Sequence, residues 1–366
     1  MRRLRILIVG AGIAGTAAAS FLARRGHEVT VVERAGAARS SGSPVDIRGG
    51  ALEAVRALGA ESALRGRDTG ARTVAFVDRL GRVITRMRLR SEPEDIEIAR
   101  ADLAAVLTEA ATDAVAFRFD ETFTALTPDD RGVDVAFGAG GQERFDLVVG
   151  ADGQHSATRR ALWDAPDGPR TRTVPMGLAI ATAPLALDIP DPRVVEIHNE
   201  PGISLAVHPA GGRPGAAFIF RADRAPTGSA DQVGLLRARY AAMGWRAGEF
   251  LAALDGVAAD DVYFDGVERV HADSWSFGRV VLLGDAASSL TILGEGSSMA
   301  LIAARGLDRA LAGSADIPAA LAGYENELRP RTERAQRGAS AGAAFLVPRS
   351  AAGIGVRNLI ARMMRA

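Results

Sequence analysis

The spacing of hydrophobic residues divides the chain into short strands and longer helices. Apolar or alternating runs predict strands, of which the first two are ILIV (6–9) and HEVTVVE (27–33). TVAFVD and RVITRMRL, separated by a polar break, predict a β-hairpin. VAFRF, VDVAF and FDLVVGAD follow as strands, and the nearly continuous apolar run RVVLLGDAA (279–287) is typical of a buried parallel strand. Helical spacing predicts helices over 52–58, 99–111, 232–254, 297–311, 317–344 and 354–364.

Between about 173 and 221 the pattern becomes strands punctuated by Pro and Gly: MGLAIAT, VVEIHN, ISLAVHP and AAFIFRA. This block, with the later VYFDGVERV, predicts an antiparallel sheet with one covered face. Because nucleotide-type segments flank these insertions, we expect an α/β protein of two discontinuous domains. The predicted boundaries are 1–72, 98–172 and 270–345 for a nucleotide-binding domain, 73–97 and 173–269 for a substrate domain, and 346–366 for a C-terminal helix.

The first strand runs directly into a glycine fingerprint. Gly10, Gly12 and Gly15 form G-x-G-x-x-G between a strand and a helix, and the second strand ends on Glu33. In such a unit the first glycine permits the sharp turn, the second lets the backbone approach a pyrophosphate, and the third lets helix and strand pack. Glu33 would then accept hydrogen bonds from ribose hydroxyls. The same site is predicted to include Ile13, Ala14 and Arg34.

A secretion signal is the alternative interpretation of the N-terminus. MRRLR, ILIV and AAAS resemble the charged, apolar and small-residue regions of a signal peptide. The glycine spacing and the second strand with its terminal acid favour dinucleotide binding instead. A cytoplasmic location is therefore expected.

Composition narrows the classes of partner. Among 366 residues, 44 Lys and Arg balance 44 Asp and Glu, which argues against nucleic acid as a partner. There is no cysteine, so thiolate metal sites and iron–sulfur clusters are excluded, and the five histidines show no metal-ligand spacing. We expect no bound metal and no membrane span, while the oligomeric state is not predicted.

Two further motifs place acids after strands. DLVVGADGQHSATRR (146–160) carries Asp152, and VVLLGDAA carries Gly284 and Asp285. Either aspartate could simply cap the next segment. Alternatively, Asp285 at the carboxyl end of a strand can bind a ligand hydroxyl at the crevice where open α/β sheets bind nucleotides. A helix predicted to begin near Ser297, after Gly294 and Gly296, would direct its free N–H groups at the same ligand.

The three motifs in this order resemble the class A FAD-dependent aromatic monooxygenases of the para-hydroxybenzoate hydroxylase type, over nearly the whole chain. ARSSGSPVDIRG and EIARADL are similar to segments of the tetracycline-inactivating and polyketide-tailoring branch. The resemblance implies that Arg39 contacts a nicotinamide cofactor and that Asp46 and Arg100 bind FAD. Arg39 and Arg100 could also be ordinary surface charges, and Arg48 is a further candidate without an assigned role.

The resemblance also implies the fold and the reaction. The nucleotide-binding domain would be a Rossmann-like FAD-binding domain, with an antiparallel-sheet substrate domain and C-terminal helices. NAD(P)H would reduce FAD, O2 would form a flavin C4a-hydroperoxide, and one oxygen would pass to an aromatic or polyketide-like small molecule. No catalytic acid or base is assigned, because the chemistry belongs largely to the cofactor.

One loop departs from the pattern of the family. Gly-Asp-Ala-Ala commonly continues with His and a later proline, whereas GDAASSLTILGEGSS has Ser288, no proline and one residue fewer. This difference keeps open the alternative of an FAD-binding oxidoreductase or ligand-sequestering relative without oxygenase activity. A second alternative, a plain NAD-dependent dehydrogenase, shares the opening glycine motif but would leave the two aspartate motifs unexplained.

Overall fold

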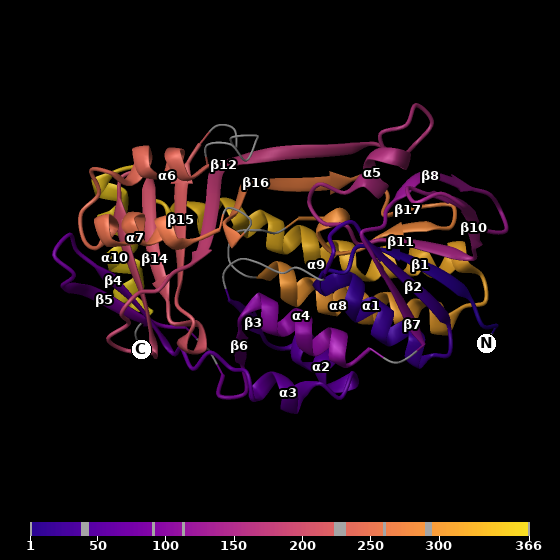
Figure 1. Ribbon diagram of the computed structural model, residues 1–366, viewed down its shortest axis with the longest axis horizontal. Coiled ribbons are helices and arrows are strands. Elements are labelled where there is room, and N and C mark those ends of the chain that lie inside the picture. The colour runs from indigo at the N-terminus through magenta and orange to yellow at the C-terminus, as the bar shows by residue number, and fades with distance from the viewer. Residues whose placement is uncertain are drawn as a thin grey trace.

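Two sheets lie end to end, and long helices run between them (Figure 1). The computed structural model describes residues 2–37, 44–89, 92–111, 114–222, 232–258, 261–289 and 295–364. The α/β architecture with C-terminal helices is as expected.

The first sheet has six strands and contains the N-terminal strand. In spatial order these are β17 (Ser276–Phe277), β18 (Val280–Leu282), β11 (Leu147–Gly150), β1 (Arg5–Val9), β2 (Glu28–Glu33) and β7 (Val115–Phe119). All pairs are parallel except β17 with β18. β11 and β18 are buried along their whole length, which explains their continuous apolar sequences. Strand 279–287 was predicted too long, because the chain turns at Gly284 with φ 63°.

Helices and a small sheet enclose this core. α1 (Ile13–Arg24) packs against α8 (Glu295–Gly313), and a three-stranded sheet contributes its apolar residues to the same core. That small sheet consists of β8 (Phe123–Pro128), β9 (Val133–Phe137) and β10 (Gln142–Phe145), of which only β9 was predicted. The remaining elements are the ribbon β3 (Val45–Ile47) with β6 (Ile96–Ile98), and α2 (Gly50–Ala57), α3 (Glu61–Arg65), α4 (Arg100–Glu109) and α5 (Ala157–Leu162).

The second sheet has seven strands. Their spatial order is β16 (Tyr263–Ala272), β12 (Thr171–Pro184), β15 (Gly215–Arg221), β14 (Ile203–His208), β13 (Val194–Glu200), β4 (Thr73–Val77) and β5 (Val83–Arg88). The expectation of a purely antiparallel sheet is wrong at one place, because β13 pairs with β4 in parallel. Between β4 and β13 the chain passes through strands of the first sheet, so no tight turn forces the two strands to be antiparallel. The predicted domain boundaries stay a prediction.

Both faces of the second sheet carry helices. α6 (Gln232–Tyr240) and α7 (Ala247–Ala253) pack on one face. The end of α9 (Ile317–Leu346) and α10 (Ala351–Met363) pack on the other, so the expectation of a single covered face is wrong. The helix predicted over 232–254 is two helices, because Trp245 has φ 58° and its N–H donates to the carbonyl of Arg79 at 2.7 Å.

Candidate functional site

The glycine fingerprint has the geometry of a tight strand-to-helix turn. Gly10 has φ 104°, a conformation that favours glycine. A Cβ built on Gly15 would lie 1.9 Å from the carbonyl oxygen of Gly10, so the third glycine allows α1 to pack against the strand. Among the described residues, no atom lies within 4 Å of a Cβ built on Gly12. The first turn of α1 beside Gly12 is where a pyrophosphate can approach the backbone.

Glu33 is held at the carboxyl end of β2. Its Oε2 accepts a hydrogen bond from the N–H of Ala11 and its Oε1 from the N–H of Ala35, both at 3.0 Å. The carboxylate therefore stands fixed beside the turn that begins α1. Each oxygen keeps a lone pair for a further donor, so a ribose contact stays a prediction that this geometry allows.

The three motifs converge at one edge of the first sheet. The N–H of Ala151 donates to the carbonyl of Val9 at 2.8 Å, and the N–H of Leu283 donates to the carbonyl of Gly150 at 2.9 Å. A Cβ on Gly284 would lie 2.9 Å from the Cβ of Ala14, which places the Gly-Asp turn against the start of α1. Segments more than a hundred residues apart therefore form one crevice at the carboxyl ends of the parallel strands.

Asp152 caps α5. Its Oδ1 accepts from the hydroxyl of Ser156 at 2.5 Å, and its Oδ2 accepts from the N–H and the hydroxyl of Thr158 at 2.9 and 3.1 Å. Ser156 in turn accepts from the N–H of Arg159, as an N-cap does. These hydrogen bonds of Asp152 agree with the capping interpretation, and its contact with a cofactor stays a prediction.

Arg159 ties the second motif to the third, a role that the sequence did not reveal. Its Nη1 donates to the carbonyl of Ala286 at 2.9 Å and its Nη2 to the carbonyl of Gln154 at 2.6 Å. Burial lowers the pKa of this guanidinium. Gln154 extends the link, because its side chain donates to the carbonyl of Gly266 at 2.9 Å and accepts from the hydroxyl of Ser289 at 3.2 Å.

Buried donors lie at the starts of the two helices that adjoin the β3–β6 ribbon, namely α4, which follows β6, and α8, which packs against β3. The hydroxyl of Ser298 donates to the carbonyl of Asp46 at 2.5 Å, which joins α8 to the ribbon. Within the described residues, the buried Nε of Arg100 and the buried hydroxyl of Ser297 have no hydrogen-bond partner. Buried polar groups normally have partners, so these two orphaned atoms fit a polar ligand at this place. Gly296 adjoins it, since its Cβ would lie 3.6 Å from Oδ1 of Asp285.

Tyr263 brings the second sheet to the same region. Burial raises the pKa of this phenol, the nearby Asp265 and Asp285 raise it further, and the charge of Arg100 lowers it. The hydroxyl lies 3.4 Å from Oδ2 of Asp265. Nε2 of the exposed His155 lies 3.0 Å from both oxygens of Asp265, and this hydrogen bond raises the pKa of the imidazole. A phenol, a carboxylate and an imidazole thus connect the crevice to solvent.

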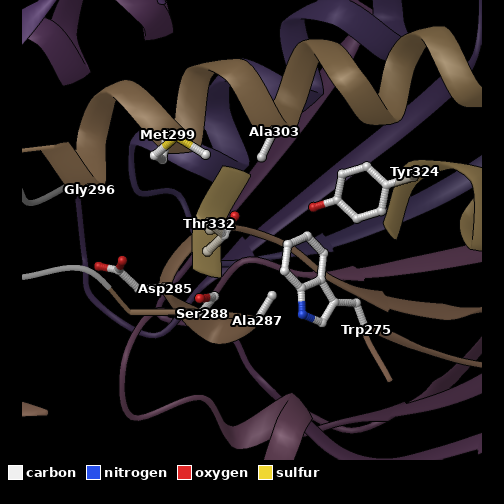
Figure 2. Close-up of a pocket in the computed structure, with 10 residues that line it drawn as sticks. Trp275, Asp285, Ala287, Ser288, Gly296, Met299, Ala303, Tyr324 and Thr332 are labelled. Atoms are coloured by element: carbon white, nitrogen blue, oxygen red, sulfur yellow. The ribbon is translucent and has the colours of Figure 1, made fainter. Parts of the chain in front are cut away.

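A small pocket lies behind the Gly-Asp turn, between α8 and α9 (Figure 2). Trp275 and Tyr324 stand at one end, and Asp285 stands at the other beside α8. Ser288, which replaces the family histidine, accepts a hydrogen bond from Nε2 of Gln336 at 2.7 Å. The pocket is lined by Trp275, Gly284, Asp285, Ala287, Ser288, Gly296, Met299, Ala303, Tyr324 and Thr332.

The remaining residues that the sequence predicted for the cofactor site differ in where the structure places them. Ile13 and Ala14 begin α1 as expected, whereas Arg34 is exposed beside Glu33 and Arg48 is half-buried after β3. The predictions for Arg39 and Gly294 lie outside the described residues. The contributions of Gln154, Arg159, Tyr263, His155 and Gln336 were missed, because their partners are far away in sequence and no local motif marks them.

The glycine turn, the fixed acid of β2 and the Gly-Asp turn define a Rossmann-like dinucleotide-binding protein. Residues 3–339 match the family described as "FAD binding domain". The chain belongs to this family, and FAD is its cofactor. The resemblance to the para-hydroxybenzoate hydroxylase type is confirmed.

Known proteins resemble the chain over most of its length. An uncharacterized protein of Mycobacterium tuberculosis (strain ATCC 25618 / H37Rv) is 34% identical over 77% of this chain and 77% of its own. A flavin-dependent monooxygenase from an unknown prokaryotic organism is 30% identical over 77% of this chain and 74% of its own. The crystal structure of tetracycline destructase Tet(55) has a TM-score of 0.84 at 29% identity and covers 99% of this chain and 96% of that chain. None of the described helices is long and apolar enough to cross a membrane.

Proposed function

We propose that this protein is a flavin-dependent monooxygenase that uses NAD(P)H and O2 to hydroxylate an aromatic or polyketide-like small molecule. Bound FAD supplies the redox chemistry and the activation of oxygen, and the protein supplies binding, orientation and the exclusion of water. The observation that carries this proposal is the convergence of three motifs at one edge of the first sheet, together with two buried donors that have no partner among the described residues, Arg100 Nε and Ser297 Oγ.

The residues of the crevice suit successive parts of FAD. Free N–H groups at the start of α1 suit the pyrophosphate, with Gly12 leaving room for it. Glu33 would bind the adenosine ribose and Asp285 a ribityl hydroxyl. The start of α8, with Ser297, would face the flavin pyrimidine edge, where the partial positive charge of a helix N-terminus stabilises negative charge.

The seven-stranded sheet offers a face for the substrate. Its register places Tyr263 opposite Thr182, Thr182 opposite Ala217, and Ala217 opposite Ala206. On β12 and β15 the alternate residues Ala181 and Phe218 pack under α6 and α7, so Thr182 and Ala217 face the other way. We infer that the small side chains beside Tyr263 form one wall of the site for a flat ring system, and that the sheet keeps water away from it.

The relatives support the reaction class. One is named a flavin-dependent monooxygenase, and the structural neighbour is named a tetracycline destructase. These names favour oxygenation over the alternative of FAD binding without oxygenase activity. They also favour a polycyclic substrate over a simple phenol.

The test begins with the visible spectrum of the purified protein and continues with consumption of NADH and NADPH in air. Phenolic polyketides and a tetracycline are added in turn, and the products are analysed by mass spectrometry. We expect flavin bands, faster NAD(P)H oxidation with a suitable compound, and a product one oxygen atom heavier. Oxidation of NAD(P)H with only hydrogen peroxide as product, across the whole panel, would contradict the monooxygenase proposal while leaving FAD binding intact.

A further inference from the structure

The C-terminal helix α10 presents an apolar stripe to solvent. Val356, Leu359 and Met363 are 59, 57 and 66% exposed, and their spacing of three and four residues places them on one side of the helix. Ile360 is exposed beside them. Single exposed apolar residues are ordinary, but a contiguous row of them marks an interaction surface. We refer to Val356, Leu359, Ile360 and Met363 as the α10 stripe.

The opposite side of α10 is fixed to the sheet. Arg357 is buried, its guanidinium lies 3.7 Å from the ring centroid of Phe76, and its Nη1 donates to Oδ1 of Asn199 at 2.7 Å. Ala361, one turn further, is fully buried in the same cluster. The helix therefore cannot rotate to hide the α10 stripe without breaking these contacts. The stripe is a permanent feature of the surface.

The C-terminal segment that contains the stripe carries charge of one sign. After Glu333 the sequence contains no Asp or Glu, although the whole chain is balanced in charge. The same segment contains six arginines, namely Arg334, Arg337, Arg349, Arg357, Arg362 and Arg365. Arg349 and Arg362 are exposed at the beginning and near the end of α10. An apolar helix face with arginines and no acids is typical of helices that lie in the interface of an anionic membrane.

A second copy of the chain fits this surface less well. A two-fold contact through α10 would place the same surface on both sides, so arginines of one copy would meet a surface that has arginines and no acids in its own segment to pair with them, which is unfavourable. A helix of 13 residues is also roughly 20 Å long, too short for the ~800 Å² per partner that stable interfaces bury.

We propose that the α10 stripe docks the protein on an anionic lipid membrane, with the apolar side chains entering the headgroup region and the flanking arginines facing lipid phosphates. In Figure 1, α10 lies with β4 and β5 at the end of the molecule remote from β7 and β10. Docking there leaves the glycine turn and the first sheet away from the lipid. This proposal does not depend on the reaction that the enzyme catalyses.

The test uses the full-length, FAD-loaded protein without substrate, in flotation with two kinds of vesicle. One kind is phosphatidylcholine alone, and the other is an equal mixture of phosphatidylcholine and phosphatidylglycerol. We expect binding to the mixed vesicles that weakens as NaCl rises from about 0.05 to about 0.5 M, because salt screens the attraction. The Leu359→Gln/Met363→Gln variant should bind at least about tenfold more weakly, and Arg362→Gln about fivefold more weakly.

Phe119→Gln is the matched control, because Phe119 is also exposed but lies on β7, in the other sheet. It should bind as the wild type does, and all variants should keep the flavin spectrum and the unfolding temperature of the wild type. Two results would overturn the proposal. One is that the wild-type protein floats with neither kind of vesicle, or that the substitutions in α10 leave its binding to the mixed vesicles unaltered. The other is a dimer in sedimentation that Leu359→Gln/Met363→Gln dissociates, since the stripe would then bind a second copy.

Discussion

The carbonyl oxygen of Gly10 occupies the space in which a side chain of Gly15 would begin, since a Cβ on Gly15 would lie only 1.9 Å from it. Close packing of α1 against the first turn brings the start of the helix to the crevice. A Cβ on Gly12, between them, would meet no atom of the described part of the chain within 4 Å. The two glycines Gly12 and Gly15 therefore serve different purposes, one for the ligand and one for the fold.

Alanine substitutions separate these purposes. Gly15→Ala forces backbone atoms apart and should destabilise the protein by several kcal/mol, as overpacking and strain do. Gly12→Ala should leave the unfolding midpoint of the apoprotein nearly unchanged while weakening FAD binding at least about tenfold, because its methyl group would fill the pyrophosphate space. Urea unfolding and FAD titration by fluorescence measure the two effects.

Gly248→Ala is the control for these changes. Gly248 lies in α7, where a Cβ would meet no described atom within 4 Å, and α7 packs on the face of the second sheet that carries Ala181 and Phe218. This variant should bind FAD normally and be as stable as the wild type or up to about 1 kcal/mol more stable. Equal FAD affinity of Gly12→Ala and wild type would show that the cofactor does not pass this turn.

Replacement of Glu33 by Gln should weaken FAD binding. The glutamine keeps one acceptor oxygen, so it can no longer accept from both Ala11 and Ala35, and it loses the charge. Hydrogen bonds to charged groups contribute about 1.5–3 kcal/mol, so the dissociation constant should rise by roughly tenfold or more. Glu28→Gln on the exposed first position of β2 is the matched control and should leave it unchanged. An unaltered constant for Glu33→Gln would remove this residue from the cofactor site.

Local features of the fold could be predicted from the sequence, and long-range ones could not. The turn at Gly10 and the long C-terminal helices follow from glycine spacing and apolar periodicity over adjacent residues. The parallel pairing of β13 with β4 depends on partners more than a hundred residues apart. Arg159 was missed for the same reason, because it donates to the carbonyl of the distant Ala286 and a buried arginine cannot be distinguished from a surface arginine in the sequence alone.

Stability should depend on pH through His155. Its hydrogen bond with Asp265 raises the pKa of the imidazole above its ordinary value of 6.5. A raised folded-state pKa means that the stabilisation is fully present below the pKa of the unfolded chain and is lost as pH rises through the folded-state value. The free energy of unfolding lost in His155→Gln should therefore be larger at pH about 5.5 than at about 8.5.

Urea unfolding of wild type and His155→Gln at these two pH values gives the comparison. His271→Gln serves as the control for a change of histidine count. Because the side chain of His155 is 59% exposed, solvent screening keeps the effect small. If His155→Gln lost more free energy of unfolding at the higher pH, the hydrogen bond between His155 and Asp265 would not stabilise the fold in the way proposed.

Removal of the Arg357 side chain should loosen α10. Burial lowers the pKa of this guanidinium to about 10, yet the side chain contacts Phe76 and Asn199. Arg357→Ala loses the charged hydrogen bond and the cation–π contact, and should cost about 3 kcal/mol in the free energy of unfolding. Arg362→Ala, an exposed arginine on the same helix, should change it by less than about 0.5 kcal/mol. If both variants are equally stable in urea, Arg357 does not anchor the helix.

The row of small residues on the second sheet can be blocked without touching the cofactor crevice. Ala217 stands next to Thr182 on one side and Ala206 on the other, so a phenylalanine there would fill the space assigned to the substrate. Ala217→Phe should keep the flavin spectrum and the slow NAD(P)H oxidation without substrate, while the stimulation by substrate falls at least about tenfold through lost binding. The conservative Ala217→Ser is the control and should retain most of the stimulation. Ala183→Phe cannot serve as a control, because Ala183 packs in the buried cluster under α6 and α7. Full activity of Ala217→Phe would place the substrate elsewhere.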